Sequence, residues 1–341
     1  MVYLNSDYTA GAHQRVLDAL LRTNMEHTAG YGNDPYTVEA KELIRKAIAQ
    51  PDAEVMFLVG GTQTNAVAID GILARHEGVM AADSGHIAVH ESGAIEASGH
   101  KVLTLPHYAG KVKAEDVECF IEEFYADETY PHMVAPGMLY ISQPTEYGTL
   151  YSLDELESLG RVCREAKIPL YIDGARMGYA LAAEGTDFTL KDIARLADVF
   201  YIGGTKVGAL FGEAVVISND ALKRDFRYSI KRHGGMLAKG RLLGIQFAQL
   251  FTDNLYMQIA QHAIDQAMRI KSALQAKGIK FLIDSPTNQQ FPIFNDAQYE
   301  ELSKKYLFSF WQRIDEEHTA VRICTSWATK SENVDCLIED I

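Results

Sequence analysis

The sequence predicts an α/β fold with a mostly parallel sheet covered by helices, followed by a smaller α+β domain. Between residues 55 and 217, short apolar runs alternate with stretches of helical spacing. These runs are continuously apolar, which is typical of strands buried on both faces. After residue 235 one long helical stretch precedes several short strands. We therefore expect a large domain over residues 1–240, with an N-terminal arm at 1–10, and a small domain over 241–341.

The elements of the large domain follow from the spacing of apolar residues and from local signals. Ser152 followed by Glu155 is a capping box that begins a helix. The predicted helices cover 12–27, 36–50, 114–125 and 187–197, with one more around Val67–Leu73 and one that begins after Ser152. The predicted strands are 55–59, 86–90, 101–105, 138–142, 169–173, 199–202 and 214–217.

The small domain is predicted to open with a helical stretch over roughly 237–277. Its short strands are expected at 279–283, 290–294, 306–310 and 321–327, with helices between them and at the end.

Composition limits the class of partner. The 341 residues include 32 Lys and Arg against 46 Asp and Glu, a net charge of −14, which argues against nucleic acid or an anionic membrane. No apolar run is long enough to cross a membrane, and residues 1–7 do not resemble a signal peptide. The cysteines form no CxxC pair, so we expect buried free thiols in a cytoplasmic protein: Cys119, Cys163, Cys324 and Cys336.

Gly60-Gly61-Thr62 stands between a predicted strand and a predicted helix. Exposed amides at a helix N-terminus accept a phosphate group. The stretch is neither a P-loop nor a GxGxxG fingerprint, which disfavours nucleoside triphosphates and NAD. The alternative is a tight turn that needs small residues.

Two charged residues follow predicted strands, where functional groups of open α/β sheets gather. Asp173 ends one strand, and a buried carboxylate needs a partner: Arg176 in a structural pair, or a protonated pyridine nitrogen. Lys206 follows the strand at 199–202, as either a solvated loop charge or an amine presented at a site.

His86 and His90 would share one face of a strand. A metal would need a third ligand, and only Glu91, on the opposite face, and His100 are near in sequence. We assign no metal site. The histidines are either packed side chains or part of an active site.

Together, a phosphate cradle, an aspartate and a lysine provide for the three groups of pyridoxal 5′-phosphate: its phosphate, its ring nitrogen and its aldehyde. The lysine would form a Schiff base, and the aspartate would keep the ring nitrogen protonated.

At these motifs the sequence resembles the threonine aldolase and β-eliminating lyase family of fold-type-I pyridoxal-phosphate enzymes, including its phenylserine-aldolase-like branch. The resemblance implies that family's seven-stranded type of sheet. It runs nearly end to end. Its motifs are Asn5-Ser-Asp7, Tyr31-Gly-Asn-Asp34, Gly60-Gly-Thr-Gln-Thr-Asn65, His86 with His90-Glu-Ser-Gly93, Asp173-Gly-Ala-Arg176, Gly204-Thr-Lys206 and Val321-Arg322.

The resemblance implies a role for each matching residue. Lys206 would form the Schiff base, Asp173 would bind the ring nitrogen, and His86 would stack on the ring and take part in proton transfer. Gly61 and Thr62, with Gly60 adjacent, would bind phosphate. Ser6, Arg176 and Arg322 would hold the substrate carboxylate. Tyr31 would reach a neighbouring subunit's site in a homodimer or homotetramer.

The implied reaction is retro-aldol cleavage of a β-hydroxy-α-amino acid, of the threonine, allo-threonine or phenylserine type, to glycine and an aldehyde. The alternatives are a β-eliminating lyase, an aminotransferase-like enzyme or a catalytically silent binding protein. Glu146 and Tyr147 stand where threonine-specific members carry a histidine. A basic residue usual after the Gly234-Gly235 motif is also missing, which leaves Lys231, Arg232 or Lys239 to approach the phosphate.

Overall fold

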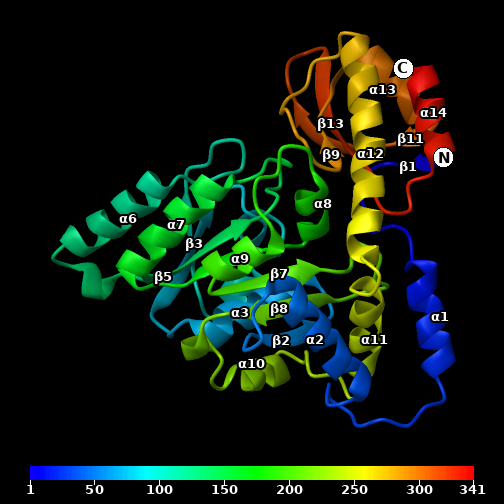
Figure 1. Ribbon diagram of the computed structural model, residues 1–341. Helices are drawn as coiled ribbons and strands as arrows, with labels where there is room; N and C mark the ends of the chain where they lie inside the picture. Colours follow the sequence, from blue (N-terminus) through cyan, green and yellow to red (C-terminus); the bar gives the residue numbers. More distant parts are fainter.

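The computed structural model describes residues 1–341 and is built around a seven-stranded sheet in the order β2-β8-β7-β6-β5-β3-β4 (Figure 1). Neighbouring strands are parallel, except that β8 runs antiparallel to both β2 and β7. The predicted α/β fold with a mostly parallel sheet is confirmed. The strands are β2 (Glu54–Leu58), β3 (Glu77–Ala82), β4 (Val102–Leu105), β5 (Ala135–Ser142), β6 (Leu170–Asp173), β7 (Val199–Gly203) and β8 (Glu213–Ile217).

Successive strand residues point to opposite faces of this sheet and enter two separate cores. Tyr171 and Tyr201 belong to the core on one face, and Ile172 and Phe200 to the core on the other. The first core is covered by α3 (Gly61–Ile72), α4 (His86–Val89), α5 (Ala94–Ala97) and α10 (Phe226–Arg232). The second includes α1 (Gln14–Thr23), α2 (Pro35–Ile48), α6 (Ala114–Ala126), α7 (Leu153–Ala166), α8 (Met177–Ala182), α9 (Leu190–Leu196) and α11 (Arg241–Leu250). Two short 3₁₀ turns, η1 (Tyr130–His132) and η2 (Asp220–Leu222), complete this part.

The C-terminal part is a small antiparallel sheet beside the upper half of the long helix α12 (Leu255–Ala276) (Figure 1). The chain's N-terminus joins it, because β1 pairs with β11 and Leu4 is buried in its core. The division near residue 240 stays a prediction. The elements are β1 (Val2–Tyr3), β9 (Gln289–Gln290), β10 (Ile293–Asn295), β11 (Tyr306–Leu307), β12 (Ser309–Arg313), β13 (His318–Cys324), α13 (Asp296–Ser303) and α14 (Ser331–Asp340).

Three predicted elements are wrong. His86 begins the helical turn α4, because the Gly85 carbonyl accepts hydrogen bonds from the Ala88 and Val89 amides. Residues 279–283 form no strand beyond one isolated bridge. The helical stretch 237–277 is two helices, since Asp253 and Asn254 adopt left-handed backbone angles between them.

The prediction of buried cysteines holds for two of the four. Cys163 and Cys324 are buried free thiols. Cys119 and Cys336 are exposed, because each lies on the solvent side of an amphipathic helix, α6 or α14.

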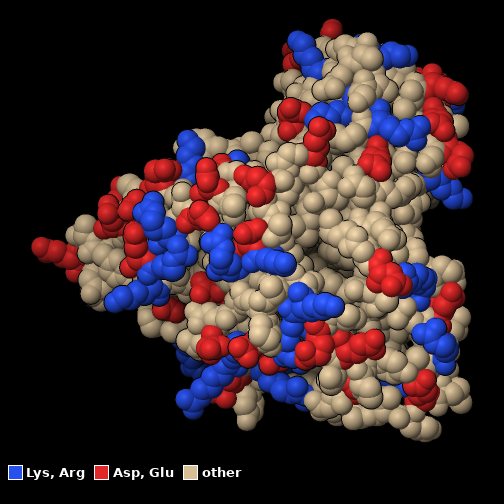
Figure 2. Space-filling view, viewed as in Figure 1, with Lys and Arg blue, Asp and Glu red and all other residues tan.

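Acidic and basic side chains are interspersed over the face seen in Figure 2. No helix is both long enough and apolar enough to cross a membrane.

Candidate active site

One pocket lies where β5, β6 and β7 end and α3 begins. Parallel strands bring their carboxyl ends to the same edge of a sheet, so residues distant in sequence meet there. Eight of the predicted site residues line this pocket: Gly60, Gly61, Thr62, His86, Glu146, Asp173, Arg176 and Lys206. Ser6, Tyr31 and Arg322 do not line this pocket.

Lys206 lies in a tight turn after β7. A Cβ atom on Gly203 would come within 2.2 Å of the Ala175 carbonyl oxygen, and one on Gly204 within 2.7 Å of the Gly212 oxygen, so both positions need glycine. Tyr179 donates a 2.6 Å hydrogen bond to the Lys206 carbonyl. Burial lowers the pKa of the Lys206 amine, and Arg176 lowers it further. A less basic amine is a better nucleophile at neutral pH.

Asp173 is held by three donors at the end of β6. The Tyr140 hydroxyl donates at 2.5 Å and the Asn65 amide at 3.2 Å, both to Oδ2. The Ala175 backbone N–H donates to Oδ1 at 2.9 Å. These donors hold both carboxylate oxygens in place at the end of β6, where a protonated ring nitrogen would bind.

The alternative pairing of Asp173 with Arg176 is wrong. Arg176 makes a bidentate ion pair with Asp7 of the N-terminal arm, with distances of 2.6 and 3.0 Å. Burial alone would raise the pKa of Asp7, but Arg176 and Lys206 hold it at about 2. Asn288 adds a third hydrogen bond to this carboxylate, at 2.9 Å. The arm and the C-terminal part therefore meet at the edge of the pocket.

The first turn of α3 presents unpaired backbone donors. The amides of Gly61, Thr62 and Gln63 make no hydrogen bond within the chain, and the first helical bond runs from Thr64 N to the Gly60 oxygen. No side chain caps this end. Free amides at the positive end of a helix dipole fit a phosphate group.

A buried hydrogen-bond chain supports His86. Its Nδ1 lies 2.7 Å from Oε1 of Glu91, and the Asn65 amide donates to the same oxygen at 2.7 Å. An ionised Glu91 can only accept, so Nδ1 carries the hydrogen and Nε2 is left as an acceptor. The His90 ring lies 5.7 Å away, and no group of three metal-ligand side chains occurs in the structure.

Glu146 connects the end of β5 to α4. Its Oε1 accepts from the Ser142 hydroxyl at 2.7 Å and from the His86 backbone N–H at 3.0 Å. Burial raises the pKa of the Glu146 carboxyl above its usual range. The adjacent Tyr147 ring lies 5.3 Å from His107 and 5.4 Å from Trp311.

Ser6 and Arg322 form a second group of polar side chains with unused donors. Arg322 donates to the Asn5 carbonyl at 3.1 Å and to Gln289 at 3.3 Å. Its Nε, the Ser6 hydroxyl and Nε2 of Gln289 are buried and make no hydrogen bond. Buried donors without partners are costly, and a carboxylate would satisfy them.

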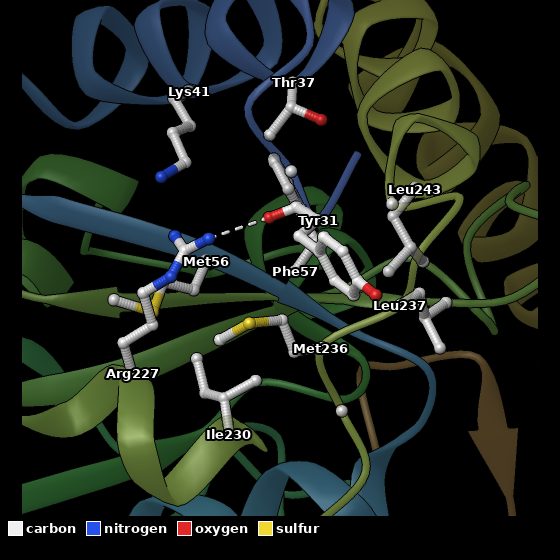
Figure 3. Close-up of a pocket in the computed structure, with 13 residues that line it drawn as sticks. Tyr31, Thr37, Lys41, Met56, Phe57, Arg227, Ile230, Met236, Leu237 and Leu243 are labelled. Atoms are coloured by element: carbon white, nitrogen blue, oxygen red, sulfur yellow. Dashed lines mark hydrogen bonds between the residues drawn. The ribbon is translucent and has the colours of Figure 1, made fainter. Parts of the chain in front are cut away.

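Tyr31 lies in a separate hollow between α2 and α10, with Met236 and Leu237 (Figure 3). Arg227 donates to its carbonyl at 2.9 Å, and the Lys231 ammonium lies 4.9 Å from its ring centre. Arg232 instead pairs with Asp70. None of Lys231, Arg232 and Lys239 lines the Lys206 pocket of the same chain.

A sequence model described as "Beta-eliminating lyase" matches residues 4–297. The chain belongs to the β-eliminating lyase family. The low specificity L-threonine aldolase of a Pseudomonas species is 29% identical over 339 residues, covering 98% of this chain and 96% of the relative. The solved structure of Leishmania major threonine aldolase is 42% identical, with a TM-score of 0.97, over 99% of this chain and 98% of that one.

An aspartate aminotransferase double mutant of Thermus thermophilus shares the fold, with 17% identity, a TM-score of 0.71, and 100% and 90% coverage. The fold is therefore that of the fold-type-I enzymes, and this member of the β-eliminating lyase family is a pyridoxal-phosphate-dependent lyase.

Sequence reasoning assigned no role to several residues of this β-eliminating lyase site. Asp7 and Asn65 belong to two of the motifs that carry the family resemblance, so those motifs could have identified them as site residues. Glu91 also belongs to such a motif, whereas Tyr140 and Glu213 carried no local signal, since their positions depend on strand register.

Proposed function

We propose that this enzyme is an aldolase that cleaves β-hydroxy-α-amino acids to glycine and an aldehyde. One observation carries the proposal: Lys206 and Asp173 line the same pocket, next to the first turn of α3. Asp173 is held by hydrogen bonds, and the first backbone amides of α3 have no partner. The names of its relatives point to the same reaction.

The pocket residues fit pyridoxal 5′-phosphate. Gly61 and Thr62, beside Gly60, would bind the phosphate group. Asp173 would bind the ring nitrogen, Lys206 would bond to the aldehyde carbon, and His86 would stack on one face of the ring. When bound, the cofactor supplies a protonated ring that accepts the electron pair released at the substrate's α-carbon. His86 is kept in one tautomer by Glu91, which suits a group that also exchanges protons.

We further propose that Arg322 and Ser6 bind the substrate carboxylate. Their buried Nε and Oγ atoms lack partners, which supports this assignment. Arg176 would contribute more weakly, because Asp7 already occupies two of its donors. Arg176 then acts chiefly by fixing the wall of the pocket.

Glu146 is our candidate for the base that takes the β-hydroxyl proton. It stands in the position of the missing histidine, lines the pocket and has a pKa raised by burial. A base whose pKa lies nearer neutrality transfers protons more efficiently. Tyr147, with His107 and Trp311, lies beside it and would contact the substituent on the β-carbon.

We also propose that the enzyme is cytoplasmic and forms a homodimer or homotetramer with sites at the subunit interface. The 46% exposed Tyr31 and its apolar hollow support an interface there, and the two buried free thiols suit a reducing compartment. Neither nucleic acid nor membrane is part of this proposal.

The test of cofactor attachment is Lys206→Ala. The variant should lose the visible absorption of the holoenzyme and the borohydride-trapped cofactor adduct, because no amine remains to bind the aldehyde. Exposed Lys277→Ala should keep both. An unchanged band in Lys206→Ala would sink the assignment.

The test of reaction type is a substrate panel of threonine, allo-threonine, phenylserine and serine. Glycine with an aldehyde indicates aldol cleavage, whereas a keto acid with ammonia indicates elimination. Amino transfer gives a keto acid without free ammonia. Absence of any product from every substrate would favour a catalytically silent binding protein.

A further inference from the structure

Glu213 is a buried carboxyl group that lines the Lys206 pocket. It is the first residue of β8 and is only 3% exposed. Because β8 is antiparallel, its first residue lies beside the last residues of its neighbours, Leu58 of β2 and Gly203 of β7. Glu213 therefore reaches the same edge of the sheet as the cofactor residues.

Strand alternation sets the direction of its side chain. Val215 and Ile217 of the same strand are buried in the core beneath α3. Residues two apart on a strand share a face, so Glu213 points to the α3 side as well. Tyr201, on the neighbouring strand, faces this side too. The carboxyl group thus lies on the face where Lys206 and Asp173 meet.

Its hydrogen bond ties it to the lysine turn. Oε2 of Glu213 accepts from the Gly204 backbone N–H at 2.9 Å, two residues before Lys206. No arginine, lysine or histidine nitrogen lies within ion-pair distance of this carboxyl. A buried carboxylate without an ion pair costs free energy, so a position of this kind needs a compensating role.

We propose that Glu213 is a positioning residue that holds the Gly204–Lys206 turn and adds a third negative charge near the Lys206 nitrogen, beside those of Asp7 and Asp173. The inference rests on the proposed role of Lys206 as the cofactor lysine. It assigns no direct contact between Glu213 and the substrate.

Three carboxylates raise the pKa of the Lys206 amine: Asp7, Asp173 and Glu213. Asp173 is satisfied by its three donors, and Arg176 is occupied by Asp7. Three nearby tyrosines have raised pKa values and stay neutral at physiological pH: Tyr171, Tyr201 and Tyr256. Burial raises the pKa of Glu213 to about 7, and the Thr205 side chain, Lys206 and the Gly204 amide oppose that rise. The charge opposite the lysine therefore changes near neutral pH.

The experiment compares the holoenzyme with Glu213→Gln, which keeps the side-chain shape and removes the charge. The pH midpoint of the visible absorption reports the proton on the Lys206 nitrogen. Without the carboxylate this proton is held less tightly, so the midpoint should fall by about one pH unit, a tenfold change. Exposed Glu184→Gln is the matched control and should keep the wild-type midpoint.

Glu213→Asp separates charge from position. It retains the carboxylate but draws it away from Gly204, so kcat should fall about fivefold or more while the midpoint moves by less than in the Gln variant. A wild-type midpoint in a cofactor-loaded Gln variant overturns the inference. If that variant does not retain cofactor, an Asp variant with wild-type midpoint and kcat overturns it. The two proposals can fail separately. If Lys206→Ala loses the absorption band but Glu213→Gln keeps the wild-type pH midpoint, only the inference about Glu213 is refuted and the proposed function stands.

Discussion

Arg322 is the residue on which recognition of the amino-acid carboxylate should depend most. Its Nε is buried and unpaired, while its two terminal nitrogens hold Asn5 and Gln289. We expect Arg322→Ala to raise the KM for amino acid by roughly 100-fold, through the loss of charged hydrogen bonds. The dissociation constant of the cofactor should change little.

Steady-state kinetics and cofactor titration check this prediction, with exposed Arg195→Ala as the control. An equal loss of cofactor and substrate binding would show that Arg322 serves the cofactor site instead.

Glu146 should set the acid limb of the pH–rate profile. Burial raises its pKa, so the ionised base is lost as pH falls through a value above the ordinary glutamate range. Glu146→Gln should lower kcat by about 100-fold and remove that limb, because no titrating base remains there. Exposed Glu128→Gln is the comparison. A Gln variant with the wild-type profile would assign the proton transfer to another group.

At the scale of elements, the first turn of α3 should control cofactor affinity. A Cβ atom on Gly61 would lie 3.2 Å from the Tyr201 hydroxyl, tighter than ordinary contact. Gly61→Ala should therefore displace the amides and raise the cofactor dissociation constant by about tenfold. Gly11→Ala, which meets nothing within 4 Å, is the control. Unchanged affinity would place the phosphate away from this turn.

The N-terminal arm should be fastened by Asp7. The Asp7 pKa is about 2 in the folded protein against 3.8 as the ordinary value, so the ionised form stabilises the fold by about 2 kcal/mol at neutral pH. This contribution is present above pH 4 and is lost as pH falls toward 2. Asp7→Asn should lower the free energy of unfolding at pH 7 by at least that amount, and the deficit should shrink in acid.

Urea unfolding of both proteins at pH 7 and pH 3 measures the difference, and exposed Asp52→Asn serves as reference. A deficit that is the same at both pH values would mean that the Asp7 charge is not what matters.

Most strands of the large sheet could be predicted because they are unbroken apolar runs, as at Val199–Gly203. Strand β3 could not, because it begins with Glu77 and Gly78 and ends in two alanines, residue types that are depleted in strands. The turn at His86–Val89 could not, since four residues are too few to show a helical period. The Arg176–Asp7 pair joins residues 169 apart, so the neighbouring Asp173 was the wrong partner to infer from sequence. The local pattern of apolar residues predicts helices and strands, whereas the ion pairs across the pocket depend on tertiary packing.

For the whole molecule, the sheet order explains why one site draws on the full length of the chain. The carboxyl edge of β5–β7 gathers Glu146, Asp173 and Lys206, and the arm brings Asp7 to the same place. The hollow at Tyr31 shares no lining residue with that pocket, and Tyr31 itself is exposed in a single chain. A residue there can serve catalysis only from across a subunit interface.

Hybrid enzymes test that arrangement. If Tyr31 completes the partner's site, both Lys206→Ala and Tyr31→Ala homo-oligomers should be nearly inactive. A hybrid pair holds one site with both residues intact, contributed by the two different chains. Random reassociation of equal amounts makes about half of the pairs hybrid, so activity should recover to about a quarter of wild type. Light scattering establishes whether the species is a dimer or a tetramer. Activity no greater than the sum of the unmixed variants would place Tyr31 in its own chain's site, because a hybrid would then hold no intact site.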